Sequence, residues 1–245
     1  MPEIWAEQAL TAEGWRSDVR VVIDAEGRIE SVTEGAQPGG HRVGALLPAP
    51  GNVHSHAFQR AMAGLTERRG PDPQDSFWTW RRLMYRFLDQ LGPDDVEAIT
   101  ALAQIEMMEA GFAASGEFHY LHRRIDGGDY DDPAEMSAAV VRAASITGIG
   151  LTLLPVLYEV GGCDGRPLGP GQRRFGSTPD SFAALHERAG AHLRALPDDA
   201  ALGLAPHSLR AVTREGLAAA VGLAGDGAVH IHVAEQVAEV EEVQA

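Results

Sequence analysis

The sequence is poor in cysteine and in long apolar stretches. Cys163 is the single cysteine among 245 residues, so no disulfide can form within the chain. The longest weakly apolar stretches, Ile149–Leu157 and Gly216–Gly225, are far shorter than the ~20 residues that a helix needs to cross a bilayer. Residues 1–10 lack the basic and then apolar pattern of a secretory signal. We therefore expect a protein of the reducing cytoplasm without a membrane partner.

Basic residues are also scarce. The chain has 20 lysine and arginine residues against 35 acidic ones, and its formal net charge is −15 at pH 7. Nucleic acids and anionic membrane surfaces reward a basic patch, so neither is expected as a partner. Hydrophobic residues make up 44% of the chain, which is enough for one large domain, or for a large domain and a small one.

The first 45 residues have the pattern of short strands joined by turns. Residues Val19–Asp24 alternate weakly between apolar and polar side chains, a turn follows at Ala25–Gly27, and Arg28–Thr33 again has a strand-like pattern. Gln37–Gly40 follows as a linker rich in glycine. We expect residues 1–45 to be part of a small β-domain, because a meander of this size buries too little to be stable alone.

Strand-like and helix-like segments alternate from residue 46 to residue 245. The expected strands are Ala45–Val53, Gly116–Tyr120, Gly150–Leu157, Ala201–His207 and Ala228–Ala234. The expected helices are Pro93–Ala110, Asp132–Thr147, Ser181–Leu196 and Thr213–Leu223. The first of these helices has apolar residues at every third position, and the last begins with a threonine that can cap it. This alternation predicts parallel βα units, and the long insertion Ala57–Gln90 is expected to carry function.

Six of the ten histidines stand at or near the C-terminal ends of the expected strands: His54, His56, His119, His207, His230 and His232. In a parallel βα barrel these strand ends converge on one face, where active sites are built. The other four fall in loops or helices and are expected at the surface: His41, His122, His186 and His192. The placement of the first group predicts a site at that face.

Two segments have the spacing of a metal site. Residues i and i+2 of a strand point to the same side, so the imidazoles of His54 and His56 can bind one ion. The alternative is two polar residues at a strand edge. Glu235 follows His232 by three residues, and it can turn toward the same ion only if the strand ends before it. The alternative for Glu235 is a surface position at the start of an acidic helix.

These motifs resemble those of the deaminase branch of the amidohydrolase superfamily, and within it the formimidoylglutamate deiminases of bacterial histidine degradation. The segments that carry the resemblance are His54–Arg60, Phe77–Arg81, Gly116–Tyr120, Pro206–Arg210 and His230–Gln236. The resemblance implies an α/β fold, a TIM-like (β/α)8 barrel of the amidohydrolase type over residues 46–245, with a small N-terminal β-sandwich part over residues 1–45. It also implies a small-molecule substrate and a homodimer when the protein is complete.

The resemblance implies a role for each motif. His54, His56 and His232 would bind one divalent ion, Zn²⁺, and Glu235 would be the acid/base, whereas His230 would pack against the site. The substrate-binding residues would be Gln59, Arg81, Tyr120, His207 and Arg210. The reaction would be the hydrolytic deamination of N-formimidoyl-L-glutamate, with a metal-bound water whose pKa is lowered to about 7. Arg210 has the planar fork that a carboxylate matches, and its alternative is a solvated charge at the start of a helix.

Other functions stay open at this point. A related deaminase of a guanine or cytosine ring would use the same metal ligands, but it would need an aromatic sandwich in place of Arg81 and Arg210. An inactive fragment or scaffold would keep the motifs without turnover, and a structural α/β domain would carry them by chance. About five of the eight strands of a barrel are expected here. The resemblance implies that a later catalytic histidine and a metal-binding aspartate are missing, so we expect the chain alone to be partly unfolded and inactive.

Overall fold

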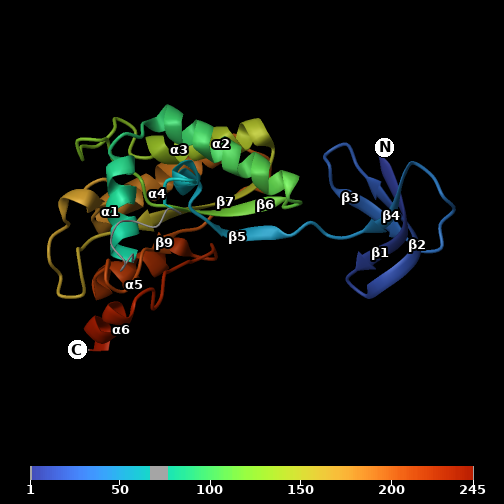
Figure 1. Ribbon diagram of the computed structural model, residues 1–245. Coiled ribbons are helices and arrows are strands. Elements are labelled where there is room, and N and C mark those ends of the chain that lie inside the picture. The colour runs from blue at the N-terminus through green and yellow to red at the C-terminus, as the bar shows by residue number, and fades with distance from the viewer. Residues whose placement is uncertain (1, 67–76, 245) are drawn as a thin grey trace. The chain divides into compact units, whose positions relative to one another are not determined.

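A computed structural model describes residues 2–66 and 77–244, without the side chains of residues 77–79. Residues 67–76 of the expected insertion lie outside the described residues. The chain divides into two compact units, Met1–Pro50 and Gly51–Ala245 (Figure 1). No helix of the described residues is long and apolar enough to span a bilayer.

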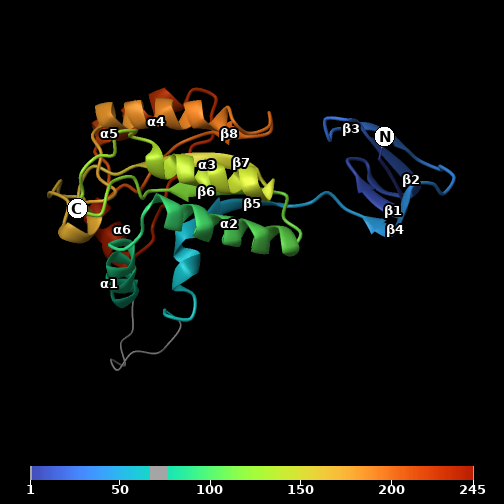
Figure 2. The same ribbon diagram turned by 90° about the horizontal axis from the view of Figure 1, so that it is seen from above.

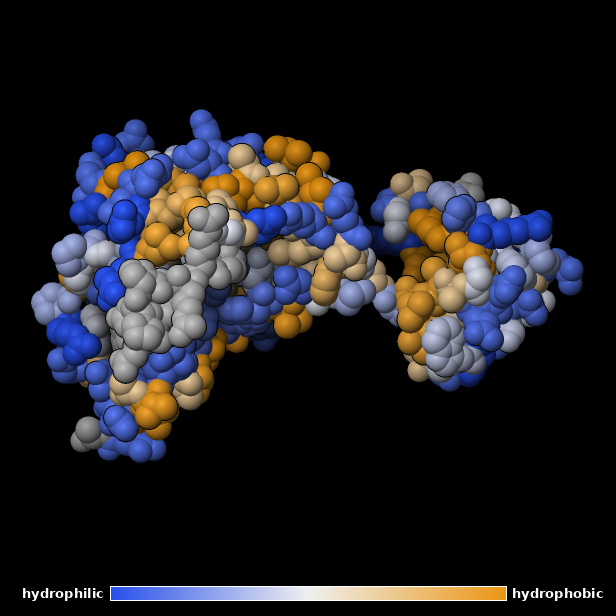
Figure 3. Space-filling model, viewed as in Figure 1, coloured by the Kyte–Doolittle hydropathy of each residue, from blue (hydrophilic) through white to orange (hydrophobic). Residues whose placement is uncertain are grey.

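The N-terminal unit is a sheet with strand order β3-β2-β1-β4 within the described residues. Its strands are β1 (Glu3–Thr11), β2 (Gly14–Ile23), β3 (Ile29–Thr33) and β4 (His41–Leu46). β1 and β2 form an antiparallel hairpin, and β4 pairs parallel to β1. The core of this sheet is small, consisting of Ala6, Ala9, Val19 and Val21, while every residue of β3 is exposed. Apolar residues are visible on the surface of this unit in Figure 3.

The second unit has a parallel sheet with helices between its strands. The strands are β5 (Gly51–Ser55), β6 (Ala114–His119), β7 (Gly150–Leu157), β8 (Ala201–Leu202) and β9 (Ala205–Pro206). The helices are η1 (Ala57–Met62), α1 (Phe77–Leu88), α2 (Pro93–Glu109), α3 (Glu135–Thr147), η2 (Pro170–Gln172), α4 (Pro179–Leu193), α5 (Arg214–Ala224) and α6 (Val237–Gln244). Figures 1 and 2 show α2 and α3 side by side along this sheet. The predicted alternation of parallel strands and helices is confirmed.

Three of the strand predictions need correction. The segment expected as one strand at Ala201–His207 is divided into two short strands, β8 and β9. The segment expected as one strand at Ala45–Val53 is divided between β4 and β5, which belong to different units, and Pro48 and Pro50 lie between them. Proline has no N–H to donate to a strand ladder, which explains the break. The segment Ala228–Ala234 forms no regular strand. It makes two isolated parallel bridges, Leu204 with Val229 and Ser208 with His232, so it continues the sheet only loosely.

The apolar positions at every third residue of α2 mark its buried face only in part. Val96 is buried, but Leu102 and Ile105 are 49% and 41% exposed, whereas Thr100 and Gln104 are buried. A helix turns 100° per residue, so a three-residue step falls short of a full turn by 60° and the stripe drifts around the helix. The prediction of a helix was therefore correct, but the spacing did not identify the face that packs.

The core of the second unit lies around β6 and β7. All but the first residue of β6 are buried, and so are most residues of β7. Burial on both faces is typical of a parallel sheet covered by helices. Gly116 lets β6 approach β5 closely, because a Cβ there would lie 2.8 Å from the Val53 carbonyl oxygen. This close approach brings the end of β5, with its histidines, against the centre of the sheet.

Candidate metal centre and active-site pocket

Three histidines converge at the C-terminal end of the parallel sheet. His54 and His56 stand at the end of β5, and His232 comes from the bridged segment after α5. The Nε2 atom of His56 lies 3.2 Å from that of His54 and 3.3 Å from that of His232. The three ligand atoms lie within 4.8 Å of one another, which makes this a group that could hold a metal ion.

Main-chain carbonyl groups fix the orientation of two of these rings. Nδ1 of His56 lies 2.9 Å from the Phe118 carbonyl oxygen, and Nδ1 of His232 lies 3.2 Å from that of His207. Each Nδ1 must carry the proton to donate to a carbonyl oxygen, so each Nε2 keeps its lone pair. Three neutral imidazoles with converging lone pairs are a donor set that suits zinc.

Burial keeps these imidazoles neutral. Burial is the main reason why the pKa of His56 is lowered to about 3, and the neighbouring His232 and His54 contribute to this shift. The pKa values of His54 and His232 are also lowered, in both cases mainly by burial. A metal ion binds the neutral form of an imidazole, so the cluster is in its ligand form at neutral pH without having to release protons.

Glu235 lies next to this cluster because the chain turns before it. Ala234 has a left-handed backbone with a φ of +57°, which residues other than glycine adopt rarely. This turn ends the extended segment after His232, as the position of Glu235 requires, and α6 begins at Val237. Glu235 lines the same pocket as His56 and His232.

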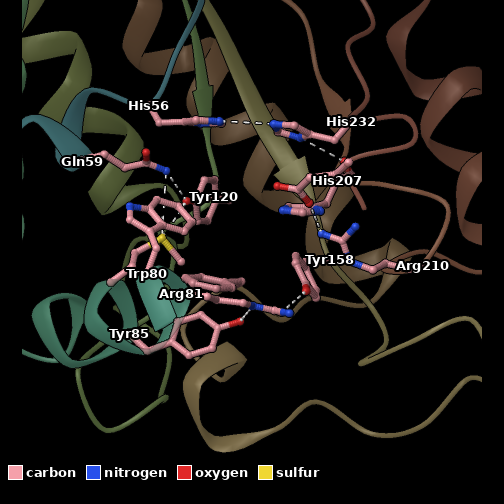
Figure 4. Close-up of a pocket in the computed structure, with 13 residues that line it drawn as sticks. His56, Gln59, Trp80, Arg81, Tyr85, Tyr120, Tyr158, His207, Arg210 and His232 are labelled. Carbon is pink, nitrogen blue, oxygen red and sulfur yellow. Dashed lines mark hydrogen bonds and ion pairs between the residues drawn. The ribbon is translucent and has the colours of Figure 1, made fainter. Parts of the chain in front are cut away.

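A pocket of about 380 Å³ opens beside the cluster. All five residues expected to bind substrate line it: Gln59, Arg81, Tyr120, His207 and Arg210. Figure 4 shows His56 and His232 facing each other, with Arg81 and Arg210 approaching from different elements. Sequence reasoning missed further lining residues: Trp80, Met84, Tyr85, Tyr158 and Phe175. Tyr158 could have been found, because it directly follows the buried strand β7.

Hydrogen bonds between side chains order the wall of the pocket. Gln59 Nε2 donates to the Tyr120 hydroxyl at 2.9 Å. Arg81, on α1, donates to the hydroxyl of Tyr85 and, at 3.4 Å, to that of Tyr158. Burial raises the pKa of Tyr120 and holds that of His207 well below its usual value. The wall therefore presents neutral hydrogen-bonding groups and a guanidinium at neutral pH.

Arg210 is buried in part and paired with two carboxylates. Its Nη2 donates to Glu235 at 2.5 Å and its Nη1 donates to Glu239 at 2.7 Å. The Arg210 and Glu239 side chains are only 11% and 4% exposed, so Arg210 is not a solvated charge. Glu239 also accepts a hydrogen bond from the Glu235 backbone at 3.0 Å. No local pattern in the sequence indicated that Glu239 is buried in this network.

The other histidines occupy varied positions. His122, expected at the surface, is 4% exposed, and its Nε2 lies 2.9 Å from the Val156 carbonyl oxygen, so this expectation was wrong. His119 is 1% exposed and packs against His122, with ring centroids 5.5 Å apart. His230 stacks on His54 with ring centroids 6.1 Å apart. Neither His119 nor His230 contributes one of the three converging ligand atoms.

Known proteins match both the sequence and the fold. Residues 1–42 match the family model of the N-terminal domain of formimidoylglutamate deiminase HutF. The whole chain is 49% identical to formimidoylglutamate deiminase of Pseudomonas aeruginosa and covers 54% of that protein. The crystal structure of an amidohydrolase from Brucella melitensis matches 99% of the chain, with a TM-score of 0.95 and 46% identity, and the chain covers 54% of it.

More distant structures share the fold alone. An adenosine deaminase from Xanthomonas campestris with bound zinc has a TM-score of 0.72 and 18% identity over 98% of the chain, which covers 51% of that structure. A guanine deaminase from C. acetobutylicum has a TM-score of 0.69 and 13% identity over 97% of the chain, which covers 54% of it. The chain spans about half the length of the curated relative that it matches.

The fold and the converging histidines define the chain as amidohydrolase-like. Within that class, the predicted resemblance to the formimidoylglutamate deiminases is confirmed, by the match over the whole of this chain and by the match of residues 1–42.

Proposed function

We propose that the natural protein containing this chain is a metal-dependent deaminase of histidine degradation, which hydrolyses N-formimidoyl-L-glutamate to N-formyl-L-glutamate and ammonia. The observation that carries the proposal is the pocket itself. It joins two ring nitrogens of the histidine cluster, a carboxylate and two arginines in about 380 Å³. A substrate with two carboxylates and a formimino carbon requires these same groups.

His54, His56 and His232 would hold one divalent ion, Zn²⁺. The fit rests on three neutral imidazoles with converging Nε2 atoms and on two Nδ1 atoms facing main-chain carbonyl groups. The solved adenosine deaminase of similar fold contains zinc, which supports the same choice. When bound, the ion would supply a Lewis acid and a water of lowered pKa.

Glu235 would move the proton. Its carboxylate lines the pocket beside His232, where one oxygen can accept a proton from water and deliver it to the leaving nitrogen. The site would also orient Glu235, because Arg210 and the turn at Ala234 restrict where its carboxylate can lie. The departing group is then ammonia, and N-formyl-L-glutamate remains.

The two arginines would bind the two carboxylates of the substrate. Arg81 comes from α1 and Arg210 from the loop before α5, so they approach the pocket from separate elements (Figure 4). A substrate carboxylate at Arg210 would share the guanidinium with Glu235 and Glu239. Gln59, Tyr120 and His207 would orient the formimino group through neutral hydrogen bonds.

The test uses the natural full-length protein, stripped of metal and then reconstituted with zinc. Ammonia release is measured with N-formimidoyl-L-glutamate, with its analogues lacking one carboxylate, and with guanine and cytosine. We expect zinc-dependent turnover of the diacid and little turnover of the analogues. Ammonia release from a ring, without release from the diacid, would contradict the proposal.

A further inference from the structure

Glu117 is a buried carboxylate outside the pocket. It lies in the middle of β6, and the residue is 2% exposed. Its carboxylate makes hydrogen bonds but no ion pair within the described part of the chain. Burial raises its pKa to about 7, which shows how costly its charge is in this position. A buried carboxylate lowers the stability of the fold, so we ask which residues Glu117 contacts to find its role.

The contacts of Glu117 lie on both sides of His56. Its Oε1 accepts a hydrogen bond from the Ala57 backbone N–H at 2.8 Å. The side chain of Ser55 also forms a hydrogen bond with the carboxylate. The next residue of β6, Phe118, binds Nδ1 of His56 through its carbonyl oxygen. Two adjacent residues of β6 therefore hold His56, Glu117 through the residues on either side of it and Phe118 through its ring.

The local backbone explains why such support is needed. The pairing of β5 with β6 is irregular between Asn52 and Ser55, so β5 is not held by a regular ladder at its histidines. The helix η1 begins at Ala57, and no side chain within the segment caps its first turn. The first N–H groups of a helix have no partner within the helix. Glu117 supplies an acceptor for one of them from the neighbouring strand.

We infer that Glu117 is a positioning residue, which fixes His56 by binding Ser55 and Ala57 and thereby sets the affinity of the histidine cluster for a divalent cation. This inference rests on the proposed metal site, and it adds a role for a residue outside the pocket. A merely structural Glu117 would affect the stability of the fold but neither the ring of His56 nor the metal affinity.

The experiment compares four variants of the natural full-length protein. Glu117→Leu removes the hydrogen-bond acceptor, and Glu117→Gln keeps one acceptor oxygen on a side chain of nearly the same shape. Ser55→Ala removes one of the two hydrogen bonds with little risk to folding. Ser115→Ala is the matched control, because Ser115 is on the same strand, is 2% exposed, and has a hydroxyl without a hydrogen-bond partner in the part of the chain that the structure describes. Zinc affinity is measured by competition with a chromophoric chelator, and the His56 ring nitrogens are followed by NMR in the metal-free protein.

We expect Glu117→Leu to weaken zinc binding by about 10- to 100-fold, the range found when a partner of a metal-ligating histidine is lost. Ser55→Ala should weaken it less, Glu117→Gln should keep most of the affinity, and Ser115→Ala should match the wild type. In the metal-free protein, the His56 ring should lose its fixed Nδ1–H form in Glu117→Leu and keep it in Glu117→Gln.

Wild-type affinity and an unchanged His56 ring in a folded Glu117→Leu protein would overturn the inference. If Glu117→Leu does not fold, Ser55→Ala decides, and an affinity and ring signal equal to those of Ser115→Ala would overturn it equally. If the wild type binds no zinc, the proposed metal site fails. The ring signal of the metal-free protein then still tests whether Glu117 positions His56.

Discussion

The second unit groups histidines in two different ways. In the cluster of His54, His56 and His232, the Nε2 atoms converge, and main-chain carbonyl groups face Nδ1 of two rings. In the pair of His119 and His122, burial is deeper, but Nε2 of His119 and Nδ1 of His122 have no hydrogen-bond partner among the described residues. Burial lowers the pKa in both groups.

The difference shows that burial and a lowered pKa do not by themselves make a metal site. Both groups hold neutral imidazoles, and a main-chain carbonyl group also faces a ring nitrogen of His122. What separates the two groups is that three ligand atoms of the cluster converge on one position, whereas the pair is part of no such group among the described residues.

The largest effect is expected from the histidines themselves. The double variant His54→Ala/His56→Ala should lose its divalent ion and all metal-dependent turnover, because a single imidazole remains. The matched control, His119→Ala/His122→Ala, should keep the ion as long as this variant is folded. Elemental analysis of both proteins measures this, and metal retained at the wild-type ratio in the first would refute the assignment.

Glu235 lies beside the histidine cluster, but it is proposed to be an acid/base and not a metal ligand. Glu235→Gln should keep the metal and lose turnover by about 10²- to 10⁴-fold, since it can no longer move a proton. Metal content and ammonia release are measured on the same preparation. Loss of both in equal measure would make Glu235 a ligand, and an unchanged rate would remove it from the mechanism.

Arg210 extends the comparison from the cluster to the pocket. Losing one partner of a desolvated charge pair costs about 2–5 kcal/mol, so Arg210→Met should lower kcat/KM strongly for the diacid while the metal content stays constant. Steady-state kinetics with analogues lacking one carboxylate are the measurement. If these analogues react as well as the diacid, Arg210 binds no substrate carboxylate.

The smallest effect concerns the pH dependence of stability, where Glu117 and the buried histidines have opposite signs. The pKa of Glu117 is raised from 4.5 to about 7, so its contribution to stability is lost as pH rises from 4.5 toward 7. That pKa difference corresponds to a free energy on the order of 3 kcal/mol. The lowered pKa values of His119 and His122 make the fold lose stability as pH falls below 6.5.

Glu117→Gln cannot ionise at this position, so the metal-free variant should be more stable than the wild type at pH 8 and nearly equal to it at pH 4.5. The histidines titrate in both proteins and cancel in the difference. Thermal unfolding of both proteins over this pH range tests the sign. A stability difference that does not change with pH would show that the carboxylate is not titrating there.

Local pattern was enough to predict much of the fold. β7 lies at the predicted residues, and α2 and α5 begin and end within one residue of their predicted bounds. Thr213 caps α5 as expected, accepting a hydrogen bond from the Gly216 N–H at 2.9 Å. These elements carry their signals in adjacent residues. His54 and His56 could also be predicted from neighbouring residues, because a spacing of two in a strand-like segment predicts side chains on one side.

The rest depends on contacts between residues far apart in the sequence. His122 is buried because β7 passes beside it, and Arg210 is paired because α6 returns to it with Glu239. Glu117 has its role only because β5 lies against β6. No periodicity records such contacts. The five expected substrate-binding residues do line the pocket, but the pairing of Arg210 with Glu235 and Glu239 could not be predicted from local pattern.

The most direct test of the metal centre is anomalous diffraction at the zinc edge, on crystals of the zinc-loaded full-length protein. We expect one peak at about 2.0–2.1 Å from Nε2 of His54, of His56 and of His232, the usual distance between zinc and a histidine nitrogen. A peak beside His119 and His122 instead, or none among the three Nε2 atoms, would contradict the account.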